Sequence, residues 1–512
     1  MSLDFEKFRL RRLVERLTAL GEVEAHHEPV ALGALATLIE ASPKVTHFYN
    51  VGPDRLEIVA GIASSRRRLA IAFGVEESAL LPEYQKRLQR PQQVVEVSSR
   101  EAPVHQIVLT GDKVDLTRLP FYLQHELDGA PYISAAIDYT IDRATGKTNV
   151  GCRRLMLKGR QELRSNLTQP SDLRQIYRDA VERKERLPVS FVVGSHPCDF
   201  LAATSKAPMD EFQLIATIRG ETLPMVRGVS NNIPVPADAE LVIEGYFDER
   251  GYSEIEGPYG ELYGLYGPMH PDPIFHVTAI TMRKDALHQS LLHGGRFLSR
   301  NDAANLCSLN IEALVWRTLK MAGIDVRAVY APTAATGLHV VKAAIKQNAA
   351  GQSRAAIAAL LKLPLVKHVF LVDDDIDVRS EDAMEWAFAT RFRIDRDVIS
   401  EPGHFALSMD PTSEQGKMTK AGFDLTRDFA APDIIENRES FTPHLKLEPR
   451  FQTVRQALET RPMLFLELME TLGTADGREL TVELDQLHQQ GLITRGQNGE
   501  WCLKSGESAP AP

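Results

Sequence analysis

Apolar residues recur at helical spacing at the start of the chain. Those between Leu10 and Leu17 lie three or four positions apart, which predicts an amphipathic helix. Mixed helix and strand signals continue to about residue 115 and include the apolar runs 56–62 and 69–73. We therefore expect an N-terminal α/β domain over residues 1–115.

The pattern changes over residues 116–305 to short extended runs separated by Gly, Pro and Asn. The clearest of these runs are residues 132–139, 189–193, 241–243 and 274–280. Helical periodicity interrupts them over residues 171–186 and 207–218. Such spacing is more typical of a barrel or sandwich than of a doubly wound sheet, so we expect a β domain with helical insertions.

Strand and helix alternate again over residues 306–452. We expect strands at residues 326–330 and 367–372, and helices at 338–348 and 354–361. This order indicates a βαβ-type unit and a C-terminal α/β domain.

The tail over residues 453–505 looks separable from the rest. Its pattern predicts helices at 463–472 and 480–490, followed by short strands at 493–495 and 500–503. That order is the outline of a winged helix. Because the tail carries more acids than bases, we expect a packing or assembly module and no DNA-binding role. Residues 506–512 predict a disordered end.

Composition and charge narrow the class of protein. The chain is 43% apolar and 25% charged, with a net charge of -10, which argues against nucleic-acid or anionic-membrane partners. The four cysteines are scattered without zinc spacing, which suits a reducing compartment. No signal peptide or membrane span is predicted, so we expect a cytoplasmic protein.

The run from Glu256 to Glu261 is the first candidate for chemistry. Its sequence, Glu-Gly-Pro-Tyr-Gly-Glu, predicts a tight loop with two carboxylates. Two carboxylates facing one cavity suit acid/base chemistry, because repulsion and burial separate their pKa values. A solvated turn explains the same six residues, and both interpretations stay open on this segment alone.

Two further candidates lie upstream, and several common motifs are absent. Arg154 ends an extended run and offers a planar fork for a carboxylate, although an ordinary salt bridge is the alternative. Glu211 lies on a predicted helix. The sequence contains no P-loop, no HExxH, no GxSxG and no dinucleotide fingerprint.

These motifs occur together in a specific order. Asn-Val-Gly-Cys-Arg-Arg at residues 149–154, then Glu211, then the run 256–261, resembles the UbiD family of reversible decarboxylases. Residues 372–377 and 386–391 are similar to that family's C-terminal domain. The resemblance covers about residues 5 to 450 and leaves the tail outside.

The resemblance implies a fold, a cofactor and partners. The middle domain would be a flavin-binding split β-barrel, and the C-terminal domain would mediate assembly into a homodimer or homohexamer. The cofactor would be prenylated FMN, supplied by a flavin prenyltransferase. It would act as the electron sink when a small carboxylic acid loses carbon dioxide.

The resemblance also implies the catalytic residues. Arg154 would hold the substrate carboxylate, Glu256 would orient Arg154, and Glu261 would protonate the product carbon. A carboxyl group that donates a proton near neutral pH needs a raised pKa. We expect burial beside a second carboxylate to raise the pKa of Glu261.

A divalent ion, Mn²⁺ or Mg²⁺, would bind the flavin phosphate, with K⁺ as a further ion. Asn149 and Glu211 match the family's metal ligands, whereas Asp172 stands where the family has histidine. Three oxygen ligands suit either divalent ion. Two carboxylates would leave less charge to attract the phosphate, so we expect a lysine to assist. The residues implied for cofactor binding are Asn149, Val150, Cys152, Arg153 and Lys420.

The substrate is less clearly encoded. Arg296 and Arg300 lie close to His293 and would bind a second anionic group if they reach the pocket; surface arginines and a structural histidine are the alternatives. The departure at Asp172 leaves a second hypothesis, a non-catalytic or weakly active flavin-binding subunit. A simple flavin reductase is a third, but it has no use for the two glutamates and Arg154.

Overall fold

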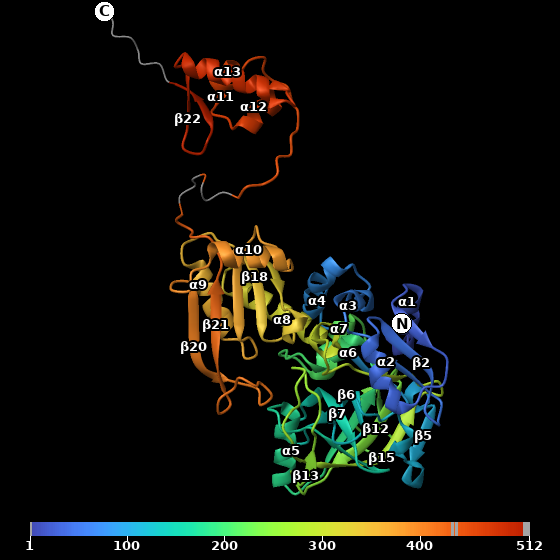
Figure 1. The fold of residues 1–512 in the computed structure, drawn as a ribbon. Coiled ribbons are helices and arrows are strands. Elements are labelled where there is room, and N and C mark those ends of the chain that lie inside the picture. The colour runs from blue at the N-terminus through green and yellow to red at the C-terminus, as the bar shows by residue number, and fades with distance from the viewer. Residues whose placement is uncertain (1–2, 432–434, 436–438, 505–512) are drawn as a thin grey trace, which may run out of the picture. The chain divides into compact units, whose positions relative to one another are not determined.

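The computed structural model describes residues 3–431, 435 and 439–504 of the chain, drawn as a ribbon in Figure 1. The chain divides into two compact units, residues 1–427 and residues 428–512. All the candidate site residues belong to the larger unit.

A four-stranded sheet organises the N-terminal region. Its order is β1–β2–β3–β16, and β16 comes from much later in the chain. The elements are β1 Val23–His26, β2 Val45–Val51, β3 Leu56–Ala60, β16 His288–Ser290, α1 Leu10–Ala19, α2 Leu35–Ala41, α3 Arg66–Phe73 and α4 Leu80–Leu88. Helix α1 buries its apolar stripe, as its spacing predicts. Because β16 joins this sheet, the segment leading to His293 is anchored beside the N-terminal region.

Six strands of the middle region close into a barrel. Their order is β12–β9–β6–β7–β8–β15, and β15 pairs back onto β12, while β5 extends the sheet beyond β15. The strands are β5 Ile107–Thr110, β6 Tyr132–Ile141, β7 Thr148–Leu157, β8 Glu162–Ser165, β9 Leu187–Val193, β12 Leu241–Phe247 and β15 Ile274–Met282. Apolar side chains such as Leu155, Val189 and Phe275 pack together as one core. The predicted barrel is therefore confirmed.

Helices inserted between the barrel strands begin at defined caps. They are α5 Asp172–Glu182, α6 Pro197–Ala203 and α7 Glu211–Arg219. The Ser171 side chain accepts from the Arg174 N–H, and the Asp210 side chain accepts from the N–H groups of Phe212 and Gln213. Asp172 and Glu211 are thus the first residues of their helices.

Two small sheets accompany the barrel. One has the order β11–β10–β4, and the other is the hairpin β13–β14. Their strands are β4 Val94–Glu96, β10 Leu223–Arg227, β11 Pro234–Pro236, β13 Glu254–Glu256 and β14 His270–Asp272. The hairpin places Glu256 at the start of the candidate loop.

A five-stranded sheet of order β17–β18–β19–β21–β20 forms the C-terminal part of the larger unit (Figure 1). Its elements are α8 Asp302–Met321, β17 Asp325–Tyr330, β18 Val340–Lys346, α9 Gln352–Leu361, β19 His368–Asp373, α10 Glu381–Arg391, β20 Val398–Phe405 and β21 Lys417–Asp424. Strands β18 and β19 are parallel and α9 connects them, which confirms the predicted βαβ-type unit.

The helix predicted over residues 338–348 is wrong. Val340–Lys346 form strand β18, paired on both sides by β17 and β19. Pairing in the middle of a sheet buries Val341 and Ile345 completely, and this tertiary packing outweighs the helix propensity of the alanines. The long helix α8 is not among the elements predicted from the sequence.

The second unit contains three helices and a hairpin among its described residues. They are α11 Val454–Thr460, α12 Phe465–Leu472, α13 Gly477–Gln489, β22 Ile493–Arg495 and β23 Trp501–Leu503. Leu458, Leu468 and Leu484 contribute to its own apolar core. The predicted helices and strands are present, whereas the winged-helix assignment stays a prediction. The predicted disordered end, residues 506–512, lies outside the described residues.

Other features complete the fold. Short 3₁₀ helices lie at Leu32–Ala34, Glu77–Ala79, Pro103–His105, Gly111–Lys113, Leu116–Arg118, Leu298–Arg300 and Thr333–Ala335. All four cysteines are free thiols. Among the described residues, no helix combines the length and the apolar character needed to cross a membrane. The domain boundaries within residues 1–452 stay predictions.

Candidate active site

Arg154, on barrel strand β7, lies between the two glutamates of the candidate loop. Its Nε lies 2.9 Å from Glu256 Oε1, and its Nη2 lies 2.6 Å from Glu256 Oε2. Its Nη1 donates to Glu261 Oε1. The three side chains are at most 9% exposed, so the solvated-turn interpretation is excluded.

Aromatic residues fix this arrangement. The Tyr132 hydroxyl donates to Glu256 Oε1 at 3.0 Å, and the Arg154 guanidinium lies 4.7 Å from the Tyr259 ring centre. The loop also depends on Gly260, because a Cβ there would lie 2.4 Å from the His125 ring. No motif in the sequence points to Tyr132 or His125; only the fold brings them to the loop.

The pKa of Glu261 differs from the expectation. Burial acts to raise it, but the hydrogen bond from His293 and the charge of Arg154 outweigh burial and lower the pKa to about 2. The expected upward shift is therefore wrong for this arrangement. The reason is that Arg154 lies between the two carboxylates, so Glu261 is paired with a cation.

The candidate metal ligands gather around the start of strand β7. Asn149 is buried, and its Nδ2 donates to Asp138 Oδ2 at 2.6 Å, which leaves its Oδ1 as the acceptor. Glu211 accepts from the Val150 N–H. Arg153 Nε donates to Asp138 Oδ1 at 2.7 Å.

Within the described parts of the chain, two carboxylates of this group lack a strong cationic partner. Burial, together with the negative charges of Asp172 and Asp138, raises the pKa of Glu211 to about 7, against the hydrogen bond from Val150. Asp172 is exposed and has Lys206 Nζ 3.4 Å from its Oδ1. An amide oxygen and two carboxylates are ligands that Mg²⁺ or Mn²⁺ accepts, so this donor set fits a divalent ion.

Cys152 and Lys420, both predicted to bind the cofactor, lie in different surroundings. Cys152 packs against the apolar core beside the barrel, and burial raises the pKa of its thiol. Lys420 is 1% exposed, on strand β21, and its Nζ donates to the carbonyl oxygens of Leu361 and Leu363 at the end of helix α9. The assignment of Lys420 to a cofactor phosphate is therefore withdrawn, because these carbonyls already bind its ammonium group.

Two further polar side chains lie close to Glu256 on the β13–β14 hairpin. His270 faces Glu256 across the β13–β14 hairpin, and its Nδ1 lies 2.7 Å from Asp272 Oδ2. Ligand atoms of Glu256, His270 and Asp272 lie within 4.8 Å of one another. Glu256 already binds Arg154 through both oxygens.

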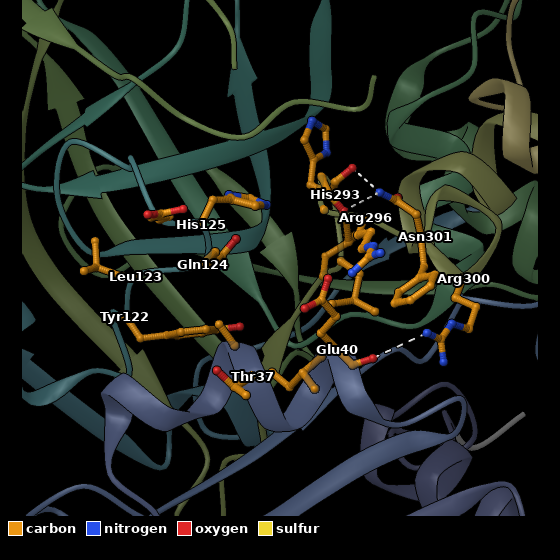
Figure 2. Close-up of a pocket in the computed structure, with 18 of the residues that line it drawn as sticks. Thr37, Glu40, Tyr122, Leu123, Gln124, His125, His293, Arg296, Arg300 and Asn301 are labelled. Carbon is orange, nitrogen blue, oxygen red and sulfur yellow. Dashed lines mark hydrogen bonds between the residues drawn. The ribbon is translucent and has the colours of Figure 1, made fainter. Parts of the chain in front are cut away.

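A cavity of about 550 Å³ opens beside the group formed by Arg154, Glu256 and Glu261. Figure 2 shows His125, Gln124 and His293 on its wall. The Tyr259 hydroxyl donates to Gln124 Oε1 at 2.6 Å, and His293 Nε2 lies 3.2 Å from Glu261 Oε2. The cavity therefore connects to Glu261 through His293.

The two predicted arginines also line this cavity (Figure 2). The guanidinium of Arg300 lies 4.2 Å from the Phe297 ring centre and that of Arg296 lies 5.9 Å from it. Arg300 Nη2 donates to the Glu40 carbonyl oxygen at 3.5 Å. In the described parts of the chain, neither arginine forms an ion pair.

Comparisons with known proteins agree with this architecture. The family model described as the 3-octaprenyl-4-hydroxybenzoate carboxy-lyase Rift-related domain matches residues 95–296, and the C-terminal domain model matches residues 304–425. The chain is similar to the anhydromevalonate phosphate decarboxylase of Methanosarcina mazei, with 29% identity over 441 residues, covering 84% of this chain and 97% of that protein.

Solved structures give the same result. The UbiD-class enzyme HmfF from Pelotomaculum thermopropionicum in complex with FMN superposes with a TM-score of 0.79 and 28% identity, covering 85% of this chain and 97% of HmfF. An evolved dimeric form of HmfF in complex with prFMN gives a TM-score of 0.76 and 26% identity, with the same coverage.

Proposed function

This chain belongs to the UbiD family of decarboxylases, and from that premise we propose that it releases carbon dioxide from a small aromatic, heteroaromatic or α,β-unsaturated acid. The observation that carries the proposal is the Arg154 guanidinium between two buried glutamates beside a cavity. A buried cation held in this way suits recognition of a carboxylate.

We assign carboxylate binding to Arg154 and its orientation to Glu256. A guanidinium has five N–H donors, of which the two glutamates engage three. One N–H on each terminal nitrogen is left for a substrate carboxylate. Glu256, held by both oxygens, fixes the plane of the fork.

Glu261 is the proposed acid that protonates the product carbon. A substrate carboxylate on Arg154 would share the cation with Glu261. Two anions on one cation raise the pKa of the weaker partner, so substrate binding favours the protonated form of Glu261. Burial of Glu261 adds to that effect. Glu261 would therefore be protonated when the substrate is bound.

Asn149, Asp172 and Glu211 would hold Mn²⁺ or Mg²⁺ for the cofactor phosphate, and Val150, Cys152 and Arg153 would line the cofactor site. Prenylated FMN, when bound, supplies the electron sink for decarboxylation. The support is the half-buried carboxylate of Glu211, whose pKa is raised by burial and by the charge of Asp172, and the FMN and prFMN in the similar HmfF structures.

The substrate we favour carries a second anionic group. Arg296 and Arg300 line the same cavity as His293, and both lack a carboxylate partner in the described part of the chain. The relative from Methanosarcina mazei is named for a phosphorylated substrate. Glu40 and Glu126 also line the cavity and would repel an anion placed near them. The second group would therefore have to lie on the arginine side.

Assembly and cofactor supply complete the proposal. The protein would act as a homodimer or homohexamer through its C-terminal α/β domain, and a flavin prenyltransferase would supply the cofactor. A dimeric form of the similar HmfF supports assembly into at least a dimer.

The test is co-expression with a flavin prenyltransferase, followed by carbon dioxide release from a panel of acids. The panel should include monocarboxylic, dicarboxylic and phosphorylated members. We expect an altered flavin spectrum and turnover of at least one acid. Glu261→Gln and Arg154→Ala should abolish turnover with cofactor still bound.

Glu254→Gln is the matched control. Glu254 lies two residues before Glu256, but it is 42% exposed and pairs with Arg164 outside the catalytic group, so turnover should persist. A flavin-loaded protein that is inert on the whole panel would instead support the second candidate, a non-catalytic flavin-binding subunit. The exposure of Asp172 is the observation that favours that candidate.

A further inference from the structure

His293 lies between the proposed acid and the cavity. One oxygen of Glu261 accepts from Arg154, and the other lies 3.2 Å from His293 Nε2. Glu261 is 6% exposed, whereas His293 is 30% exposed and lies on the cavity wall. His293 therefore connects the buried Glu261 to the cavity.

The backbone on both sides of His293 is fixed by the start of helix α8. The Asn301 side chain donates to the carbonyl oxygens of His293 and Gly294, as the dashed lines in Figure 2 show. Asp302 accepts from the Leu292 N–H at 2.7 Å and from the Ala63 N–H at 2.6 Å. Because these bonds hold its backbone, His293 is pre-positioned against Glu261.

Other ionisable groups face the same cavity from several segments. They are His125 and Glu126 from the segment after Tyr122, Glu40 from helix α2, and Arg296 and Arg300 from the segment of His293 itself. Tyr259 lies 6.0 Å away between ring centres, and His125 has its own carboxylate, Asp128, at 3.2 Å. Among the described groups, Glu261 is the carboxylate within hydrogen-bond distance of His293.

We propose that His293 is a proton-relay residue that recharges Glu261 from the water of the cavity. The inference rests on the proposed function, because it explains how that reaction obtains its proton. In this role His293 acts on the reaction through Glu261.

The proton balance is simple. Conversion of a carboxylate into carbon dioxide and a C–H product consumes one proton per turnover, and Glu261 becomes a carboxylate when it gives up that proton. When the next substrate carboxylate binds to Arg154 and favours the protonated form of Glu261, a His293 imidazolium transfers its Nε2 proton to Glu261 Oε2 and becomes neutral. Cavity water returns one proton to the ring.

The experiment compares His293→Gln and His293→Ala with a matched pair elsewhere. His404 and Glu401 on strand β20 have the same Nε2–Oε2 distance, 3.2 Å, and the same 30% exposure of the imidazole. We expect His293→Gln and His293→Ala to lower turnover about 10²-fold and to flatten its pH profile. Added imidazole should restore His293→Ala, and His404→Ala should match the wild type.

A second measurement does not depend on turnover. Carboxyl ¹³C NMR of glutamate-labelled protein follows the ionisation of Glu261 directly. Removing the His293 hydrogen bond should raise the titration midpoint of Glu261, because that bond favours the ionised form. A midpoint that stays in place in His293→Ala overturns the relay, and so does a wild-type rate and pH profile in His293→Gln.

The two levels of the proposal can fail separately. An active wild type with an equally active His293→Gln variant removes the relay and leaves the decarboxylase assignment intact. A cofactor-loaded wild type that is inert on every acid removes the decarboxylase assignment, whatever the NMR titration gives. Folding of each variant is checked by its thermal unfolding midpoint.

Discussion

Two polar regions begin on the same strand, β7, and differ in where their positive charge comes from. In the first, Arg154 supplies the cation between Glu256 and Glu261. In the second, the charge of Asp172 acts on Glu211, and the ion pair that Asp172 forms among the described residues is with the exposed Lys206. The pKa of Glu261 is lowered to about 2, whereas that of Glu211 is raised to about 7.

The two regions differ in whether the chain itself supplies a cation beside the buried carboxylates. Burial acts to raise the pKa of both carboxylates, and the presence of a nearby cation decides the outcome. The Arg154 region has its charge built into the chain. The Glu211 region would reach the same balance only when a cation is added. Each of the following predictions perturbs one region and leaves the other as reference.

The largest effect should follow Arg154→Ala. Removing one partner of a buried ion pair leaves two carboxylates uncompensated and costs about 3–5 kcal/mol of unfolding free energy. Urea denaturation measures this loss, and turnover should fall beyond detection. Arg160→Ala is the control, because Arg160 is 80% exposed and lies 3.7 Å from Asp115. A loss below about 1 kcal/mol in Arg154→Ala would mean that its charge is not needed there.

Asp172→Ala should produce the next largest effect. If Asp172 is a metal ligand, its removal lowers Mn²⁺ affinity by at least about tenfold and depletes bound flavin. Isothermal titration calorimetry and the flavin absorbance measure the two quantities. Asp179→Ala is the control, since Asp179 lies on the same helix but bonds to Gln175. Unchanged flavin content in Asp172→Ala would remove Asp172 from the metal site.

The pH dependence of stability should have opposite signs in the two regions. The lowered pKa of Glu261 contributes stability above pH 4.5 that is lost as the pH falls toward 2. The raised pKa of Glu211 means that the folded state binds more protons than the unfolded state between pH 4.5 and 7, so stability falls as the pH rises through that window.

Glu211→Gln isolates the second of these slopes. Without divalent ions, the variant should gain about 1 kcal/mol on the wild type between pH 5 and pH 7.5, a value reduced for the half-buried position of Glu211. Urea unfolding at the two pH values measures the gain. Added Mn²⁺ should reverse it, because the ion stabilises only the wild-type carboxylate. Parallel pH curves for the two proteins would contradict the raised pKa.

Sequence patterns predicted much of this molecule because its motifs are local. Arg154, Glu256 and Glu261 were assigned from their motifs, and the barrel was predicted from its spaced strands. Neither the charge state of Glu261 nor the contact with His293 could be predicted in this way. Both depend on a contact between the 256–261 loop and the segment that follows β16, which are distant from strand β7 in the sequence.

The errors have the same origin. Residues 338–348 fit a helix pattern as well as a strand pattern, and the decision comes from pairing with β17 and β19. Lys420 follows a plausible motif, but its orientation toward the end of helix α9 depends on packing of the C-terminal sheet. In each case a contact between distant segments outweighs a local pattern.

The smallest effect should follow Lys206→Ala, which perturbs the region of Glu211 and Asp172. Because Lys206 and Asp172 are 80% and 60% exposed, their ion pair should contribute less than about 0.5 kcal/mol to stability. Removing the ammonium group also removes a positive charge that would repel a divalent ion. We therefore expect Mn²⁺ affinity to rise two- to threefold at low salt, by calorimetry, and the gain to shrink at high salt. Lys113→Ala, on an exposed turn, should leave the affinity unchanged. A fall in Mn²⁺ affinity in Lys206→Ala would instead mean that Lys206 holds Asp172 in its binding position. Lys206 would then already supply part of the positive charge of this region.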